Sequence, residues 1–300
     1  MEQNKKVELF LDSGAFSAKS QGVEINLKEY IQFIKENESV INIYANLDVI
    51  GDAEATWKNQ QKMERVGLHP MPCFHYGEDL KWLKLYLDKY DYIALGGMVR
   101  GGTDLLIRWL DPLFANHLCD SAGIPKVKVH GFGLTSLPLM LRYPWFSVDS
   151  TSWVVTGRMG SIYIPRYRSG EWLYDEQSWK IAVSNRSPNQ KEAGQHISTL
   201  TPGQRQILLN YIHDKGYVLG KSDFKKVEQS HELAENERWA EKKPTDKYAQ
   251  RELETIIEPG ICNKYQLRDE MNIIYFLDLE KSMPAWPWAY KAKEIQNGFF

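Results

Sequence analysis

Carboxylates recur in this chain at the points where apolar stretches end. Asp12, Asp48 and Asp149 each follow such a stretch. The carboxyl ends of parallel strands meet at one mouth of a barrel or one edge of a sheet, so acids placed there can share a site. Two carboxylates in one site suit the cleavage of a glycosidic bond, because one acts as nucleophile and the other as general acid and base. The spacing therefore indicates glycosidic-bond chemistry.

Glycines end two of the other apolar stretches. Gly96 and Gly97 follow one of them, and Gly131 and Gly133 follow another. Positions without side chains let a flat ligand approach the backbone and form hydrogen bonds with its amides. Carboxylates combined with backbone amides fit a purine-like base better than a sugar polymer.

Asp48, His75 and His130 each allow a structural and a functional interpretation. Asp48 is followed by Gly51, which is typical of a turn leading into a helix. His75 and His130 lie at the ends of apolar stretches, where a histidine can be packed and satisfied or can contact a ligand. Both interpretations stay open for all three residues.

Apolar stretches and amphipathic helical patterns alternate through the first half of the chain. Strands are predicted at 9–11, 40–48, 72–77, 92–97, 126–133 and 145–149, and helices at 27–38, 53–66, 79–90, 103–119 and 136–142. This alternation predicts an α/β fold with parallel strands, either a TIM-like (β/α)8 barrel or a doubly wound sheet. Polar residues or glycines end every predicted strand, which favours the barrel because all of its strand ends converge on one mouth.

The alternation stops beyond residue 166. A possible seventh strand covers 161–165, and residues 167–260 are predicted to be an insertion or a helical elaboration of a single barrel domain spanning residues 1–300. Within it, residues 221–258 are dense in charge, which favours solvent-facing helices. Residues 272–277 fit either an eighth strand or a closing helix.

Composition narrows the class of protein. The chain has 300 residues and a net charge of −2, which argues against a strongly basic nucleic-acid coat but not against a local basic groove. It contains no apolar run long enough to span a membrane and no signal-peptide core, so we expect no membrane partner. Cys73, Cys119 and Cys262 lie far apart, which fits a reducing cytoplasm.

Four motifs in chain order resemble those of the tRNA-guanine transglycosylase family. They are DSGAF at 12–16, LGGM at 95–98, HGFG at 130–133 and VDS at 148–150. The chain is most similar to the phage branch of that family that acts on DNA, the 7-deazaguanine DNA transglycosylases. The resemblance covers roughly residues 7–166 and implies a TIM barrel. It also implies a host-cell cytoplasmic location for a phage-encoded chain.

The resemblance implies a role for each matching residue. Asp149 would be the nucleophile that attacks C1′ of the target deoxyguanosine, and Asp12 the general acid and base. The purine pocket would be lined by Ser13, Asp48, His75, Gly96, Gly97, His130, Gly131 and Gly133. The reaction implied is replacement of guanine in DNA by a 7-deazaguanine such as preQ0. The alternatives are the same exchange in tRNA, a glycoside or nucleoside hydrolase, and a non-catalytic nucleic-acid-binding barrel.

The chain departs from the family pattern in three places. The family's Cys-x-Cys-x-x-Cys zinc site is absent, since Cys262 stands alone, so no metal or cofactor is expected. Ser152 stands where a second Asp is usual, and Ala15 where a Gly is usual.

Three arginines that follow the VDS motif are candidate contacts for phosphate groups: Arg158, Arg166 and Arg168. They also fit an ordinary exposed surface. The base that enters and the oligomeric state stay open.

Overall fold

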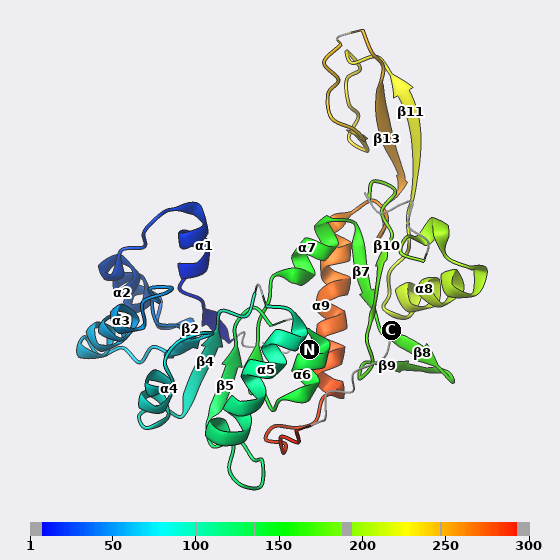
Figure 1. The fold of residues 1–300 in the computed structure, drawn as a ribbon. Helices are drawn as coiled ribbons and strands as arrows, with labels where there is room; N and C mark the ends of the chain where they lie inside the picture. The colour runs from blue at the N-terminus through cyan, green and yellow to red at the C-terminus, as the bar shows by residue number, and fades with distance from the viewer. Residues whose placement is uncertain (1–7, 100, 135, 188–193, 247, 293–300) are drawn as a thin grey trace. The chain divides into compact units, whose positions relative to one another are not determined.

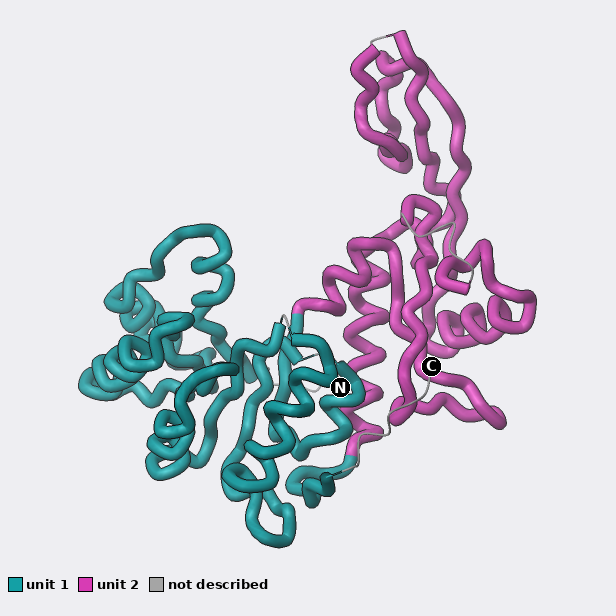
Figure 2. Tube along the Cα trace, viewed as in Figure 1, with its two compact units in different colours: residues 1–150, 284–300 teal, residues 151–283 magenta. Residues whose placement is uncertain are grey.

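The chain is divided into two compact units. The structure, a computed structural model, describes residues 8–99, 101–134, 136–187, 194–246 and 248–292. Unit 1 consists of residues 1–150 and 284–300, and unit 2 of residues 151–283 (Figure 2). Helices and parallel strands alternate in unit 1, so the predicted mixed α/β class is confirmed. The sequence led us to expect one barrel domain with an elaboration at 167–260, whereas the structure gives residues 151–283 a unit of their own.

Short parallel strands form the centre of unit 1 (Figure 1). They are β1 (Leu9–Leu11), β2 (Ile41–Tyr44), β3 (Cys73–His75), β4 (Tyr92–Gly96), β5 (Lys128–Gly131) and β6 (Ser147–Val148). β1 pairs with β2, and β3 to β6 pair in chain order. A parallel bridge between Ala45 and Met71 continues the pairing from the end of β2 toward β3. The strands therefore follow one another in space as they do in the sequence.

Helices connect the strands of unit 1. They are α1 (Ala15–Gln21), α2 (Leu27–Glu36), α3 (Ala53–Arg65), α4 (Leu80–Leu87), α5 (Thr103–Leu113) and α6 (Leu137–Arg142). Asn26 caps α2 by accepting a hydrogen bond from the backbone N–H of Lys28. α1 was not predicted; it begins after Gly14, whose positive φ of 73° lets the chain turn sharply behind β1. α5 continues into a π-helical turn, Phe114–Leu118.

The sheet of unit 1 is strongly curled. The ring of Phe10, in β1, stacks on that of His130, in β5, with ring centroids 4.7 Å apart and planes inclined by 21°. Four strand spacings separate β1 from β5, which in a flat sheet would be roughly 19 Å. The inner face must therefore fold back on itself, as it does in a barrel. Among the described residues, the strand pairings end at β6 and do not close into a ring.

The C-terminal segment returns to unit 1. The indole N–H of Trp286 donates to the carbonyl of Pro144 at 3.1 Å. Tyr290 is buried; its backbone N–H donates to the carbonyl of Gly123, and its hydroxyl donates to Asp111 Oδ1 at 2.9 Å. These aromatic residues anchor the segment to unit 1.

Unit 2 combines antiparallel strands with three helices. Its elements are α7 (Ser152–Arg158), β7 (Ser161–Ile164), β8 (Arg166–Arg168), β9 (Glu171–Leu173), β10 (Trp179–Ala182), α8 (Pro202–Asp214), β11 (Lys221–Val227), β12 (Glu237–Trp239), β13 (Arg251–Glu258) and α9 (Tyr265–Ser282), with a 3-10 turn at Ile197–Thr199. Buried Asn272 joins three of them: its amide donates to Trp153 O in α7, and its oxygen accepts from Tyr163 N in β7. β7 pairs with β10 in antiparallel fashion, so it does not extend the parallel sheet of unit 1 as a seventh strand.

Residues 221–258 form strands rather than the predicted helices. β11, β13 and β12 make a three-stranded antiparallel sheet with β13 at its centre (Figure 1). The prediction was wrong because lysine and glutamate favour helices by intrinsic propensity. In an exposed sheet they can instead be placed opposite each other across strands, as Lys226 and Glu252 are. Residues 272–277, left open between strand and helix, lie within α9.

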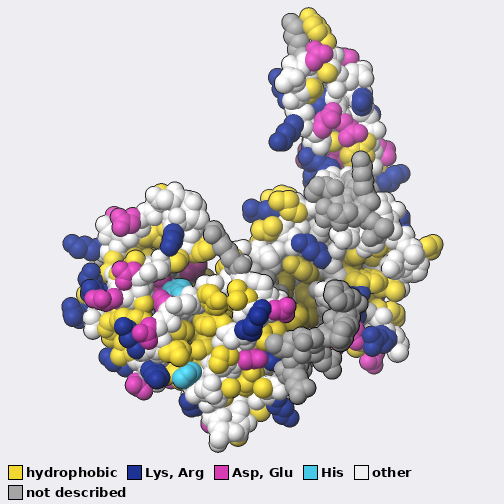
Figure 3. All heavy atoms as spheres, in the orientation of Figure 1, with side chains coloured by type: hydrophobic (Ala, Val, Ile, Leu, Met, Phe, Trp, Pro, Cys, Tyr) yellow, Lys and Arg dark blue, Asp and Glu magenta, His cyan; other side chains and the backbone are white. Residues whose placement is uncertain are grey.

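On the face drawn in Figure 3, acidic and basic side chains are interspersed over both units, as the small net charge indicates. No helix in the described ranges is both long enough and apolar enough to cross a bilayer.

Candidate functional site

The carboxyl ends of the strands of unit 1 carry the polar residues that the sequence pointed to. Asp12 directly follows β1 and Asp149 directly follows β6, while His75 and Gly96 are the last residues of β3 and β4. His130 is the penultimate residue of β5. Because these strands are parallel and follow each other in order, these residues lie along one end of the curled sheet.

Asp149 is held by the turn after β5 and stays accessible. Its Oδ1 accepts a hydrogen bond of 2.8 Å from the backbone N–H of Gly133, and its side chain is 44% exposed. His130 Nε2 lies 3.5 Å from the same oxygen. The hydrogen bond from Gly133 thus engages one carboxylate oxygen of Asp149 and leaves the other oxygen available.

A buried hydrogen-bonded chain orients His130. Its Nδ1 lies 2.7 Å from Ser147 Oγ, which lies 2.6 Å from the hydroxyl of Tyr92. Tyr92, Ser147 and Nδ1 thus form a series of hydrogen bonds, and Nε2, on the other side of the ring, faces Asp149 without a hydrogen-bond partner among the described residues. The structure thus places His130 between Ser147 and Asp149, an arrangement that its sequence position alone did not indicate.

Asp12 has the electrostatic character of a carboxyl that can carry a proton. Partial burial raises its pKa, and the negative charge of Asp149 raises it further, while the backbone N–H groups of Gly14 and Ser13 act in the opposite direction. The residue nevertheless keeps exposed surface. The charge of Asp149, at the end of β6, thus reaches Asp12, at the end of β1.

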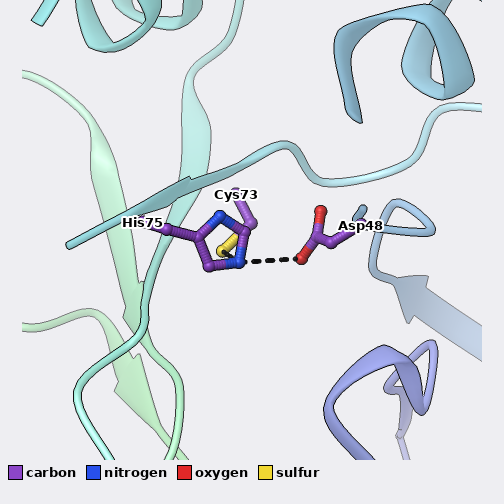
Figure 4. Close-up of side chains that lie close together, drawn as sticks. All are labelled: Asp48, Cys73 and His75. Atoms are coloured by element: carbon purple, nitrogen blue, oxygen red, sulfur yellow. Dashed lines mark hydrogen bonds and ion pairs between the residues drawn. The ribbon is translucent and has the colours of Figure 1, made fainter. Parts of the chain in front are cut away.

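Asp48 and His75 form a second, more buried part of the site (Figure 4). His75 Nε2 lies 3.3 Å from Asp48 Oδ2 and 3.6 Å from Cys73 Sγ. On the other side of the ring, Glu78 Oε1 lies 3.3 Å from Nδ1, and Glu78 Oε2 accepts from the backbone N–H of His75 at 3.0 Å. Glu78 therefore fixes the imidazole and directs its Nε2 toward Asp48.

Burial and charge decide the protonation of this cluster. Burial raises the pKa of Asp48, with His75 acting against the rise, and raises the pKa of Cys73 to about 12. Burial alone would lower the pKa of His75, but the neighbouring Cys73, Asp48 and Glu78 outweigh it and raise the pKa. A thiol with a pKa of about 12 is neutral at pH 7, so the carboxylates of Asp48 and Glu78 are the neighbours that favour the charged imidazole there.

The same donor atoms could hold a metal ion. One donor atom each of Asp48, Cys73 and His75 lies within 4.8 Å of the others. A tetrahedral zinc ion, with bonds of about 2.0 Å to nitrogen and oxygen and about 2.3 Å to sulfur, would separate its N and O ligands by about 3.3 Å and its N and S ligands by about 3.5 Å. The observed separations are 3.3 Å and 3.6 Å. Glu78 on Nδ1 would be the usual outer-shell partner of a metal-bound histidine.

The absence of a metal was expected because the family's cysteine-rich site is missing, and this stays a prediction. In the sequence, the sign of this cluster is Cys73 and His75 two residues apart on one strand, which places both side chains on the same face. Glu78 was not predicted as a site residue. It lies three residues beyond the end of a strand, and nothing in its local sequence marks it as a partner of His75.

Gly96 is explained by packing. A Cβ at position 96 would lie 2.8 Å from both Cys73 Sγ and His75 Cδ2, so a side chain there would displace the cluster. Gly97 has a φ of +78°, which disfavours other residues, and its added Cβ would lie 3.1 Å from Tyr76 N. These glycines therefore allow the neighbouring strand to bring His75 into place.

The three arginines that the sequence suggested for phosphate contacts do not form one group. All three lie in unit 2. Arg166 donates to Gln177 O at 2.7 Å and lies over the ring of Trp179, and Arg168 pairs with Glu176 on the surface. Arg158 instead lines a cavity together with residues that the sequence did not single out, among them Arg186, Arg238 and Arg268.

The structure thus brings most of the predicted site residues to one end of the unit 1 sheet. The carboxylates interact across it, since the charge of Asp12 contributes to the raised pKa of Asp48 and that of Asp149 to the raised pKa of Asp12. Comparison with protein-family models, with curated proteins and with solved structures finds no match for this chain.

Proposed function

We propose that the protein is a base-exchange glycosyltransferase that replaces guanine in DNA by a 7-deazaguanine through a covalent intermediate on Asp149. The observation that carries the proposal is the pair of unlike carboxyls: Asp149 is accessible and accepts a hydrogen bond from the N–H of Gly133, whereas the pKa of Asp12 is raised by burial and by the charge of Asp149. Unlike environments of this kind separate a nucleophile from a general acid. The proposed substrates, guanine in DNA and a 7-deazaguanine, follow from the resemblance of the four strand-end motifs to those of the transglycosylase family.

The fold that we propose for this reaction is a (β/α) barrel built on β1 to β6. Parallel order, helical connections and the contact between Phe10 and His130 support it. In such a barrel the carboxyl ends of the strands form the mouth where catalytic residues gather.

The first half of the reaction forms the intermediate. A carboxylate oxygen of Asp149 attacks C1′ of the target deoxyguanosine, and the bond from C1′ to the purine nitrogen breaks. The purine leaves with the bonding electron pair, and Asp12 supplies the proton that makes it neutral guanine. The N–H of Gly133 holds Asp149 in place by its hydrogen bond, and His130 Nε2 lies beside the same oxygen.

The second half reverses these steps with a different base. The 7-deazaguanine gives its proton to Asp12, which is now ionised, and its nitrogen attacks C1′. The bond between C1′ and Asp149 breaks, and the carboxylate is regenerated. The target nucleotide must be everted or single-stranded to reach this position.

Asp48 is suited to recognise the edge of the purine. Among the described residues, its buried Oδ1 has no hydrogen-bond partner, whereas Oδ2 faces His75. Guanine and 7-deazaguanine both present two neighbouring N–H donors, the ring N–H and the exocyclic amine. A buried carboxylate acceptor without a partner is costly, and such donors would satisfy it. We therefore propose Asp48, with Ser13, His75 and Gly97, as the base pocket.

Replacement of Cys73 separates this role from metal binding. We expect Cys73→Ala to retain base exchange within about threefold, because Asp48, His75 and Glu78 remain, and to lower the free energy of unfolding by about 1–2 kcal/mol, because a buried side chain is shortened. Exchange kinetics, thermal melting and zinc content by plasma mass spectrometry check this. One zinc ion per wild-type chain, lost together with activity in Cys73→Ala, would contradict the base-pocket assignment.

Release of labelled guanine tests the reaction itself. DNA containing radiolabelled guanine is incubated with the protein, with and without preQ0, and the DNA is digested to nucleosides for mass spectrometry. Base exchange predicts preQ0-dependent release and a new deazaguanine deoxynucleoside in equal amounts. Release without incorporation would indicate a hydrolase instead.

A parallel incubation with tRNA distinguishes the two polymers. The proposal predicts a modified deoxynucleoside and no modified ribonucleoside under the same conditions. Modification confined to tRNA would replace DNA as the substrate while keeping the base-exchange chemistry.

A further inference from the structure

Unit 2 contains a cavity of about 350 Å³ with an unusually basic lining. The residues around it come from the end of α7, the segment after β10, strand β12 and the first turns of α9. They are Arg158, Met159, Gly160, Ser184, Arg186, Arg238, Tyr265 and Arg268. Four arginines therefore line one cavity in a chain whose net charge is −2.

Arg268 is the fixed member of this set. Its side chain is 95% removed from solvent, since the residue is only 5% exposed. Nε donates to Gly157 O and Nη1 to Ile261 O, both at 2.7 Å, so the guanidinium is locked in place. Within the described ranges, Nη2 has no hydrogen-bond partner and no carboxylate lies within 4.0 Å of the group. Burial lowers the pKa of Arg268 to about 10 and Arg238 adds to this, yet the group remains charged at neutral pH.

Acidic side chains compensate this charge only in part. Glu254 pairs with Arg238 at 2.8 Å and also accepts from Ser222. Burial raises the pKa of Asp269, and the positive charges of Arg158 and Arg268 act against this rise. Arg158 and Arg186 are exposed and, among the residues that the structure describes, have no ion pair. Two exposed arginines of the lining therefore have no ion pair among the described residues, and a third lining arginine, Arg268, is buried.

We propose that Arg158, Arg186, Arg238 and Arg268 form a binding pocket for a phosphate group, and that this phosphate belongs to the backbone of the polynucleotide substrate. The assignment of the phosphate to a polynucleotide rests on the proposed function. The inference that the pocket binds a phosphate group rests on the cavity alone. Guanidinium groups match phosphate oxygens in charge and in hydrogen-bond geometry, and several of them around one cavity suit a dianion or a phosphodiester. Ser184 and Tyr265 add hydroxyl groups at the wall and at the rim.

The pocket differs from the phosphate contacts that the sequence suggested. Arg166 donates a hydrogen bond to Gln177, and Arg168 forms an ion pair with Glu176. The pocket instead brings together arginines up to 110 positions apart in the chain, from Arg158 to Arg268. A contact to one phosphate in a fixed pocket sets the register of the strand without reading its sequence.

The test uses the double variant Arg158→Gln/Arg186→Gln in the full chain. Both side chains are exposed, so the fold should survive, which a thermal melt checks. The matched control is Arg205→Gln, an exposed arginine on α8. Binding of a fluorescent oligo-dT strand is measured by anisotropy over a range of salt concentrations. Oligo-dT contains no guanine, so binding does not depend on the base-exchange chemistry.

The proposal predicts at least a tenfold loss of oligo-dT affinity in the double variant and a shallower dependence on salt, by one to two released ions. Arg205→Gln should change affinity by less than twofold. Wild-type affinity in the double variant, or no oligo-dT binding by the wild-type chain, would overturn the proposal.

A competition arm identifies the source of the phosphate. Inorganic phosphate and thymidine 5′-monophosphate are titrated against the bound oligo-dT. Displacement only at millimolar concentrations supports a backbone site, whereas tight phosphate or nucleotide binding that leaves oligo-dT bound would overturn the polynucleotide assignment. If guanine release fails while the double variant still loses oligo-dT, the base-exchange function is wrong and the phosphate pocket stands.

Discussion

Asp149→Asn should abolish both the covalent protein–DNA adduct and the release of guanine. We expect the rate to fall by a factor on the order of 10⁴ or more, because a neutral amide oxygen is a poor nucleophile. The amide oxygen can still accept the hydrogen bond from the N–H of Gly133, so the local geometry and the fold should survive. Loss of activity would then be caused by the missing negative charge and not by a change in the fold.

The measurement traps the adduct between wild-type protein and a radiolabelled oligonucleotide on a denaturing gel, with no incoming base present. The control is Asp223→Asn, which removes an exposed carboxylate on β11 of unit 2 and should leave the adduct intact. A mobility-shifted band that persists in Asp149→Asn would show that another residue is the nucleophile. A non-catalytic nucleic-acid-binding protein would give no adduct in any variant.

Asp12→Asn should lose activity while keeping or raising stability. General acid and base catalysis contributes about 10²–10⁴ in rate, and Asp12 serves in both halves of the reaction, so we expect a loss in that range in each half. Asparagine can neither supply the proton to the leaving guanine nor accept one from the incoming base. Adduct formation and base uptake measured separately, in single turnovers, check this.

The raised pKa of Asp12 predicts how the rate of adduct formation changes with pH. The pKa of Asp12 is raised above its ordinary value by burial and by Asp149, and adduct formation needs the protonated form. In the wild-type protein the rate of adduct formation should therefore fall as the pH rises through the raised pKa. In Asp12→Asn the residual rate should no longer show this fall. An identical pH profile in both proteins would contradict the assignment of Asp12 as the acid.

The same shift has a consequence for folding. A carboxyl with a higher pKa in the folded than in the unfolded chain binds more protons when folded, so its stabilising contribution is present at low pH and is lost as the pH rises through the folded-state pKa. Ionised Asp12 therefore costs stability at neutral pH. Asp12→Asn should not lower the melting temperature there, and a large decrease would show that the carboxylate has a structural role instead.

Strand ends were predictable because they depend on local pattern. Apolar runs followed by a polar residue or a glycine gave the position of Asp12, His75, Gly96, His130 and Asp149 relative to their strands. The alternation with helices gave the parallel order. These features are set by residues close together in sequence, so periodicity alone reveals them.

Residues 221–258 show where local pattern fails. Lysine and glutamate count toward a helix when each segment is read alone, yet β11 and β13 become stable strands by pairing with each other. A cross-strand partner such as Glu252 for Lys226 lies outside any window used to judge one segment. The partner, rather than the segment, decides the secondary structure here.

By itself, the sequence determined the class of the fold, the order of the parallel strands and the set of polar residues at their ends. Tertiary structure decided how these residues act: it curled the sheet so that Phe10 meets His130, placed Glu78 and Cys73 around the ring of His75, and gathered four arginines of unit 2 around one cavity. Local pattern specifies which face of an element is buried, but charges and hydrogen bonds act through space between residues far apart in the chain. Their pKa values and partners therefore exist only once the chain is folded.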